Sequence, residues 1–149
     1  MKTINQIESM TPFDMHLFTE SFVSGAQQNN IEIQYFKDSK DDQSFYARVR
    51  FLEGAQGRPG IVHGGAIAAV FDECMGAITL NNNQPAYTAS LKIDYISPLT
   101  VEAIFYVESH LLKTEKRKTF ITGQIFDENQ KLFAKSEGLY ITPKNEVES

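Results

Sequence analysis

The chain has 149 residues, of which 42% are hydrophobic, and this is enough for one domain with a buried core. Its net charge of −5 argues against a general nucleic-acid-binding surface. A single cysteine, Cys74, allows no internal disulfide and fits a reducing compartment. No apolar run approaches the roughly 20 residues that span a bilayer, and residues 1–10 lack the apolar core of a secretory signal. We therefore expect a cytoplasmic protein that does not insert into membranes.

The first part of the chain predicts a helical segment followed by a hairpin. Within the N-terminal segment 1–28, a helix over 11–28 is predicted from Thr11-Pro12 and from apolar residues at helical spacing: Phe13, Leu17, Phe18 and Phe22. Residues 31–37 alternate in polarity and predict a strand, and residues 45–51 predict a second strand beyond the polar turn 38–43. A glycine-rich loop follows at 54–60.

The remainder predicts one buried helix and four strands. Residues 65–80 are apolar on nearly every face, so this helix must be wrapped by other structure. Strands are predicted at 87–96, 101–112, 118–127 and 131–141, and their short connections indicate an antiparallel meander. The acidic tail 144–149 is expected to be disordered. The economical arrangement is a single α+β domain over 1–149, with a bent antiparallel sheet of five or six strands around one long central helix.

The most informative segment runs from Gly57 to Glu73. It joins a turn, the glycines Gly64 and Gly65, an apolar run, and then the acidic pair Asp72-Glu73. Two glycines at a helix start leave backbone N–H groups uncovered, which suits negative charge. A carboxylate within an apolar segment is costly to bury without a partner or a task. An oxyanion site and a carboxylate about two helical turns apart are the parts of a hydrolase for activated carbonyls.

These features resemble the hotdog fold, and more narrowly the 4-hydroxybenzoyl-CoA/phenylacetate-type thioesterase superfamily. The resemblance extends from about residue 45 to 142 and rests on four segments: Pro59–Gly65, Asp72-Glu73, Thr88–Pro98 and Arg117-Lys118. It implies a hotdog domain that hydrolyses acyl-CoA thioesters without a metal or redox cofactor. It also implies a homodimer, with a dimer of dimers as the larger alternative.

The resemblance further implies roles for single residues. Gly64 offers its backbone N–H to the thioester oxygen, with Gly65 beside it in the substrate site. Asp72 is the general base or the nucleophile. Thr88, with Ser90 as the second choice, reaches over from the partner subunit and positions water or the acid. Each active site then combines Gly64 of one subunit with Asp72 of the other.

Residues around the motif have competing roles. His63 is a hydrogen-bonding anchor that shapes the turn or, alternatively, a general base. The family's Asn or Gln six residues before this histidine is replaced by Gly57, so Gln56 is the candidate for the water-orienting amide. Glu73 lies about 100° from Asp72 on a helical wheel, so a structural or dimer-contact role competes with the role of a rival acid.

Basic residues supply candidates for contact with the CoA phosphates. Lys113, Lys116, Arg117 and Lys118 crowd one predicted turn, which is either a solvated turn or a phosphate contact. Arg117 is the best single candidate, and Arg58 beside the motif is a further option. Neither of the two histidines outside the motif has an acidic or cysteine partner at metal-binding spacing, so we expect no metal site.

Two other classes of function stay open. One is a hotdog hydratase for enoyl thioesters, which needs a paired acid and histidine on one loop. The other is a non-catalytic acyl-CoA-binding module, which would keep the acyl slot without needing Asp72.

Overall fold

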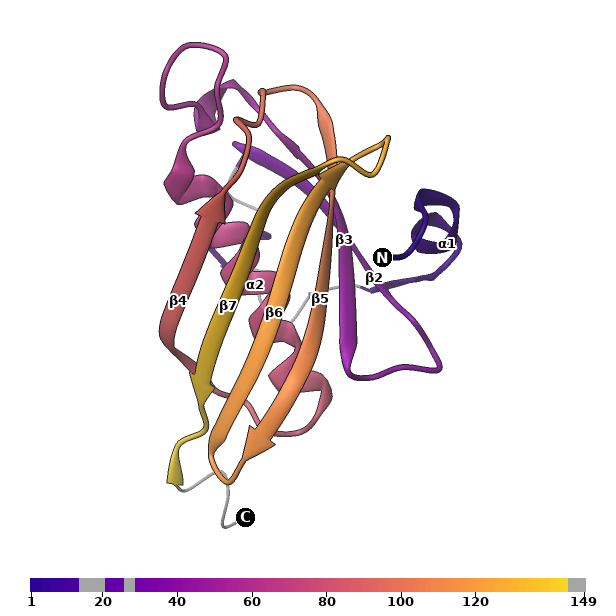
Figure 1. The fold of residues 1–149 in the computed structure, drawn as a ribbon, viewed down its shortest axis with the longest axis vertical. Coiled ribbons are helices and arrows are strands. Elements are labelled where there is room, and N and C mark those ends of the chain that lie inside the picture. The colour runs from indigo at the N-terminus through magenta and orange to yellow at the C-terminus, as the bar shows by residue number, and fades with distance from the viewer. Residues whose placement is uncertain (14–20, 26–28, 145–149) are drawn as a thin grey trace.

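The structure is a computed structural model that describes residues 1–13, 21–25 and 29–144. In this part of the chain, seven strands form one antiparallel sheet in the order β1-β2-β3-β5-β6-β7-β4, and Figure 1 shows the long helix α2 crossing behind β4, β7, β6 and β5. The elements are α1 (Ile4–Glu8), β1 (Thr11–Phe13), β2 (Ile31–Lys37), β3 (Ser44–Phe51), the 3-10 turn η2 (Glu53–Ala55), α2 (Gly64–Asn81), β4 (Tyr87–Tyr95), β5 (Ile104–Glu115), β6 (Lys118–Asp127) and β7 (Leu132–Ile141). No helix within the described ranges has the length and hydrophobicity to cross a membrane. The predicted α+β hotdog arrangement is confirmed.

The central helix α2 packs closely on the sheet. Its side chains Phe71 and Met75 are fully buried against the strands. A Cβ on Gly123 of β6 would lie 3.0 Å from the Phe71 ring, and one on Gly138 of β7 would lie 2.9 Å from the Met75 methyl group. Because both distances are too short for an ordinary carbon contact, glycine at these two positions lets the helix sit against the sheet. The close packing fixes which side of α2 faces the strands.

Most of the predicted elements are confirmed, but the order of the sheet is not. The helix predicted over 65–80 is α2, and the predicted hairpin is the antiparallel pair β2–β3. The sheet has seven strands rather than five or six, and β4 does not continue into β5 as a meander. Instead β4 pairs with β7 at the sheet edge, and β5 pairs with β3. The reason is that α2 carries the chain across the sheet, so that β4 arrives beside the last strand.

The helix predicted over 11–28 is wrong at its start. Thr11–Phe13 forms strand β1, which pairs with β2 at the other edge of the sheet. Proline is tolerated in an edge strand, because its missing N–H removes no essential ladder bond there. Phe13 is held by Phe45, whose ring it meets edge-to-face at 5.4 Å between centroids. Phe22 lies in a turn and is 79% exposed. Residues 14–20, 26–28 and 145–149, with Leu17, Phe18 and most of the predicted tail, lie outside the described residues.

A short helix that the sequence reading missed covers the outer face of the sheet. The N-terminus of α1 is closed by a capping box between Thr3 and Gln6. Its Ile7 is fully buried in a second apolar cluster with Phe36, Tyr46, Tyr106 and Phe126 of the strands. The Glu8 carboxylate accepts hydrogen bonds from Arg48 and from the Tyr106 hydroxyl, which tie α1 to the sheet. The outer face is thereby partly closed, while the inner face holds α2.

Candidate active site

The first backbone N–H groups of α2 differ in whether they meet an acceptor among the described residues. His63 is the N-cap residue, and its Nδ1 accepts a hydrogen bond from the N–H of Gly65 at 2.8 Å. The His63 carbonyl accepts from the N–H groups of Ala66 and Ile67. The N–H of Gly64 meets no acceptor in the described part of the chain. The anchoring interpretation of His63 agrees with this geometry, and Gly64 keeps the donor that can meet a developing negative charge.

The loop before the helix is held by its own hydrogen bonds. The N–H of His63 donates to the carbonyl of Ala55 at 2.8 Å, and Gln56 forms a β-bridge with Val62. The side-chain carbonyl of Gln56 accepts from the N–H of Gly60 at 3.0 Å. Gln56 therefore shapes the loop with its amide oxygen. Arg58 lies exposed on the same loop.

Two hydroxyl groups converge on one oxygen of Asp72. Thr88 of β4 donates to Asp72 Oδ1 at 2.5 Å, and Tyr140 of β7 donates to the same oxygen at 3.2 Å. Asp72 Oδ2 has no hydrogen-bond partner among the described residues. Burial, with the neighbouring charge of Asp72, raises the pKa of Tyr140 above its ordinary value, so the phenol stays protonated. The carboxylate is thus held on one side and open on the other.

A β-bulge in β4 decides which hydroxyl reaches Asp72. Leu91 and Ile93 pack toward the core, and the Tyr95 hydroxyl donates to the Gly64 carbonyl at 2.8 Å. In this part of β4 the odd-numbered residues therefore face α2. The pairing with β7 shifts between Thr88 and Ser90, and this irregularity brings Thr88 to the inner face. Ser90 is exposed and lies on the outer face, so the structure does not bring it to the site. Thr88 contacts Asp72 of its own chain, so this contact needs no partner subunit.

The second acid of the pair has a different environment. Glu73 accepts hydrogen bonds from the hydroxyls of Ser21, Ser24 and Tyr35. It therefore ties the turn at 21–25 to α2, which agrees with the structural alternative for this residue. Burial raises the pKa of the following Cys74 thiol, which lies within the core.

A pocket of about 490 Å³ opens beside Asp72. It lies between the C-terminal half of α2 and the start of β4. Small and apolar side chains line most of it, and its polar lining residues are Asp72, Glu73, Thr79, Thr88 and Tyr140. The apolar members are Gly76, Ala77, Leu80, Pro85, Ala86 and Tyr87. Such a pocket suits an apolar chain whose reactive end lies at the carboxylate.

The basic turn lies at the same end of the sheet as this pocket. Lys118 pairs with Ile141, and Ile141 pairs with Tyr87, so two strand spacings of about 4.8 Å separate the turn from the pocket wall. Lys118 is exposed, whereas the Arg117 guanidinium is half-buried and donates to the carbonyl of Thr142 at 3.4 Å. The exposed lysine is therefore freer than Arg117 to meet an anion.

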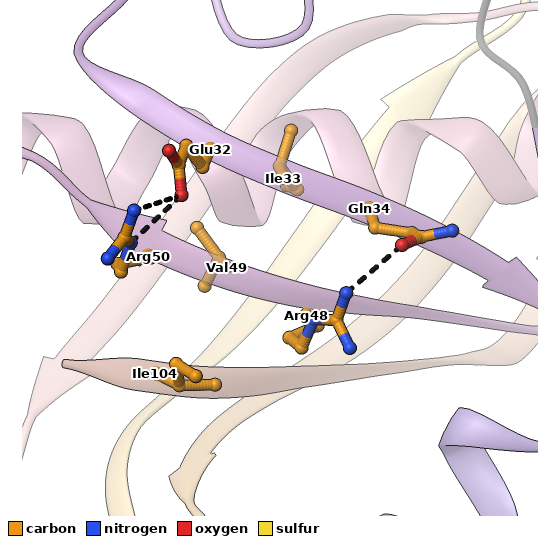
Figure 2. Close-up of a pocket in the computed structure, with 7 residues that line it drawn as sticks. All are labelled: Glu32, Ile33, Gln34, Arg48, Val49, Arg50 and Ile104. Atoms are coloured by element: carbon orange, nitrogen blue, oxygen red, sulfur yellow. Dashed lines mark hydrogen bonds and ion pairs between the residues drawn. The ribbon is translucent and has the colours of Figure 1, made fainter. Parts of the chain in front are cut away.

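The pocket in Figure 2 lies elsewhere and offers no comparable chemistry. It has a volume of about 380 Å³ beside β2 and β3, and Figure 2 shows its charged residues paired across these strands. Arg50 pairs with Glu32 at 2.7 Å, and Arg48 donates to Gln34 at 3.1 Å. Among the described residues, no group of three or more His, Cys, Asp or Glu side chains is placed to hold a metal ion.

An antiparallel sheet wrapped around one long central helix is the hotdog fold, and here that helix carries the Gly64 N–H at its start and the Asp72 carboxylate about two turns later. Residues 59–134 match the thioesterase superfamily, which is about half of the chain, and the chain belongs to this superfamily.

Known relatives agree with this assignment. The mouse protein acyl-coenzyme A thioesterase THEM4 is 38% identical over 128 residues, covering 83% of this chain and 52% of its own. The crystal structure of zebrafish thioesterase superfamily member 2 has a TM-score of 0.71 and 17% identity, covering 96% of this chain and 100% of that chain. The crystal structure of another thioesterase superfamily protein has a TM-score of 0.67 and 26% identity, covering 73% of this chain and 53% of that one. The chain spans about half the length of the curated relatives it matches.

Proposed function

We propose that this protein hydrolyses acyl-CoA thioesters to a carboxylic acid and CoA. The observation that carries the proposal is the Asp72 carboxylate, held through Oδ1 by two hydroxyls and open at Oδ2 beside an apolar pocket. Membership of the thioesterase superfamily supports the reaction class, and a relative named acyl-coenzyme A thioesterase supports the substrate class.

In the proposed reaction Asp72 acts as the general base. Its Oδ2 accepts a proton from a water molecule while the water oxygen attacks the thioester carbonyl carbon. The N–H of Gly64 stabilises the oxyanion that forms. When the tetrahedral intermediate collapses, the carbon–sulfur bond breaks, and the CoA sulfur takes the proton back from Asp72. In the alternative, Oδ2 attacks the carbonyl itself, the carbon–sulfur bond breaks, and CoA leaves as the thiolate, so that a mixed anhydride with Asp72 remains. Water then hydrolyses this anhydride to the carboxylic acid and free Asp72, and the proton that is released goes to the CoA sulfur. Attack of 18O-labelled water on the Asp72 carbonyl carbon would place 18O in Asp72, and only this second route can do so.

The same geometry supports a homodimer with shared sites. Gly64 and Asp72 are eight residues apart on one helix, which is about 12 Å at 1.5 Å per residue. One carbonyl oxygen and its attacking water cannot bridge that distance, so we propose that Gly64 of one copy meets Asp72 of the other.

A surface for the second copy is available. Strand β4 is nine residues long and lies at the sheet edge, and a free edge of this length is usually paired or covered. Its large residues Tyr87 and Tyr95 are 55% and 52% exposed in the single chain. The neighbouring side of α2 carries small, partly exposed residues such as Gly64 and Ala68, which would let a second helix approach closely. We propose β4 and this side of α2 as the dimer contact, with a dimer of dimers as the larger alternative.

We further propose that Lys116 and Lys118 meet the CoA phosphates. The turn holds a pocket of about 380 Å³ lined by Glu115, Lys116, Arg117, Lys118 and Ile141. Its place near the Asp72 pocket supports a ligand that extends from the carboxylate toward the turn. We also propose that the protein is located in the cytoplasm, because a single cysteine fits a reducing compartment.

A thiol-release assay with a panel of acyl-CoAs tests the proposal. We expect release of free CoA together with an equal amount of carboxylic acid. Addition of water to an enoyl-CoA without thiol release would instead identify a hydratase. Binding of acyl-CoA without any turnover, across aromatic, medium-chain and long-chain esters, would identify a binding module.

A further inference from the structure

We propose that Tyr140 is a positioning residue for the thioesterase reaction, which holds Asp72 Oδ1 and leaves Oδ2 as the oxygen that reacts. This inference rests on the proposed function and assigns a task to a residue outside the His-Gly-Gly motif and the acidic pair. Tyr140 acts through Asp72, because its hydroxyl contacts the carboxylate.

The Tyr140 ring is held rigidly. It is 1% exposed and packs in the main core between β7 and α2. A Cβ on Gly138 would lie 2.8 Å from the ring carbon Cε2, and a Cβ on Gly76 would lie 3.5 Å from Cε1. Glycine at 138 therefore makes room for the ring, and the helix at Gly76 closes its other side. A hydroxyl on so confined a ring is a fixed reference point for the carboxylate.

The hydroxyl is always available as a donor. It lies 3.2 Å from Asp72 Oδ1 and 3.4 Å from the Asp72 backbone carbonyl. Burial, reinforced by the charge of Asp72, holds the pKa of Tyr140 well above its ordinary value. The phenol therefore keeps its proton in the working range of an enzyme and donates a hydrogen bond to Asp72 Oδ1.

Two donors on the same oxygen make the carboxylate asymmetric. Thr88 and Tyr140 both end on Oδ1, so they fix the torsion of the Asp72 side chain and stabilise its negative form. Thr88 lies on an exposed strand, whereas Tyr140 is buried. We infer that Tyr140 supplies the rigid contact of the two and that Oδ2 receives the proton from water.

The Tyr140→Phe variant tests the inference because it keeps the ring and removes only the hydroxyl. We expect kcat to fall about tenfold, as for loss of one hydrogen bond to a charged group, with KM changed less than about twofold. The acidic limb of the pH–rate profile should move to higher pH, since the carboxylate loses a donor to its charged form. In an Asp72→Asn background, Tyr140→Phe should change the residual turnover little.

Two further variants complete the test. Tyr106→Phe is the matched control, because the buried Tyr106 also donates to a carboxylate, that of Glu8, at 2.9 Å on the outer face. Its kinetics should equal those of the wild type. Gly138→Ala keeps the hydroxyl but pushes the ring, and it should lower kcat as well.

Each failure has its own signature. A folded wild-type protein that hydrolyses no acyl-CoA overturns the proposed function. A wild type that hydrolyses acyl-CoA and a Tyr140→Phe variant with unchanged kcat and pH profile overturn the inference alone. Loss of activity with an unmoved acidic limb and a lowered melting temperature would mean that Tyr140 acts only through stability, and this too overturns the inference.

Discussion

Mixing two inactive variants should restore about a quarter of the wild-type activity. The reason is the spacing of the two candidate groups on α2. The free N–H of Gly64 and the carboxylate of Asp72 are about 12 Å apart within one chain, whereas an oxyanion donor acts at about 3 Å. A site that uses both groups must therefore draw them from two copies.

The structure supplies a clean variant for each group. Gly64 is the first residue of α2, where proline is well tolerated, so Gly64→Pro removes the N–H with little change to the helix. His63 has φ −62° and ψ 134°, the extended geometry that suits the residue before proline. A Cβ at Gly64 would lie 3.5 Å from the Tyr95 ring, an ordinary contact. Asp72→Asn keeps the shape of the acid and removes the base. We expect each variant alone to lose about 10²-fold or more in turnover.

The magnitude of recovery follows from subunit statistics. In an equal mixture that exchanges freely, half of the dimers are mixed, and each mixed dimer has one intact site of two, which gives about a quarter of the wild-type activity. The assay is thiol release, with exchange measured independently by energy transfer between labelled subunits. Gly64→Ala, which keeps the N–H, is the control and should stay active. Proven exchange without recovery, or an active monomer in light scattering, would refute a shared site.

Three further predictions concern the surroundings of the site and the outer face. Thr88→Val should lower kcat about tenfold, because valine lacks the hydroxyl that donates to Asp72 Oδ1, whereas Thr88→Ser keeps this hydroxyl and should keep the wild-type kcat. Equal rates for the two variants would show that the Thr88 hydroxyl does not position Asp72. If Lys118 contacts the CoA phosphates, Lys118→Ala should raise KM for acyl-CoA but not for a short pantetheine thioester, and added salt should weaken this effect. Arg117→Ala should instead lower the melting temperature, because the Arg117 guanidinium donates a hydrogen bond to the Thr142 carbonyl. Burial alone would raise the pKa of Glu108, but hydrogen bonds from His110 and from the backbone N–H of Lys2 outweigh it and lower that pKa below 4.5. Glu108 therefore stabilises the fold fully above about pH 4.5 and loses this contribution as pH falls through the lowered value. Melting temperatures measured against pH should show a flatter acid decline for Glu108→Gln than for the wild type.

The sequence predicted those elements whose signal is local. Residues 65–80 are apolar on nearly every face apart from the acidic pair, so α2 is predicted with its ends nearly correct. Residues 31–35 alternate in polarity, and the structure confirms strand β2 over the predicted range 31–37. The strand at 118–127 likewise agrees with β6, because charged turns bound it on both sides. Periodicity and turn chemistry were sufficient for these elements.

Elements that depend on distant contacts were missed or misplaced. The place of β4 at the edge beside β7 depends on where α2 delivers the chain, and no residue in β4 encodes it. Thr11-Pro12 reads as a helix start, but pairing with β2 and the contact of Phe13 with Phe45 make it a strand. The helix propensity of a few residues is a weak preference, and tertiary contacts of this kind override it.

The candidate site divides in the same way. The sequence alone supplies the motif residues Gly64 and Asp72 as candidates, but the choice between Thr88 and Ser90 depends on a bulge that alternation alone does not reveal. Tyr140 was missed. The available signal was a hydroxyl-bearing side chain at an inward position of β7, in the same alternation as Ala134, Ser136 and Gly138.

The adjacent acids Asp72 and Glu73 illustrate what packing adds to a helical pattern. On α2 they point about 100° apart, and although both line the same pocket, they accept hydrogen bonds from different donors. Glu73 receives the hydroxyls of Ser21, Ser24 and Tyr35, and three donors leave little capacity for a substrate. Asp72 receives two hydroxyls on a single oxygen, which leaves Oδ2 open toward the pocket. The number and placement of hydroxyl donors therefore separate a carboxylate that secures the N-terminal turn from one that remains available for chemistry, and this is why we assign the base to Asp72.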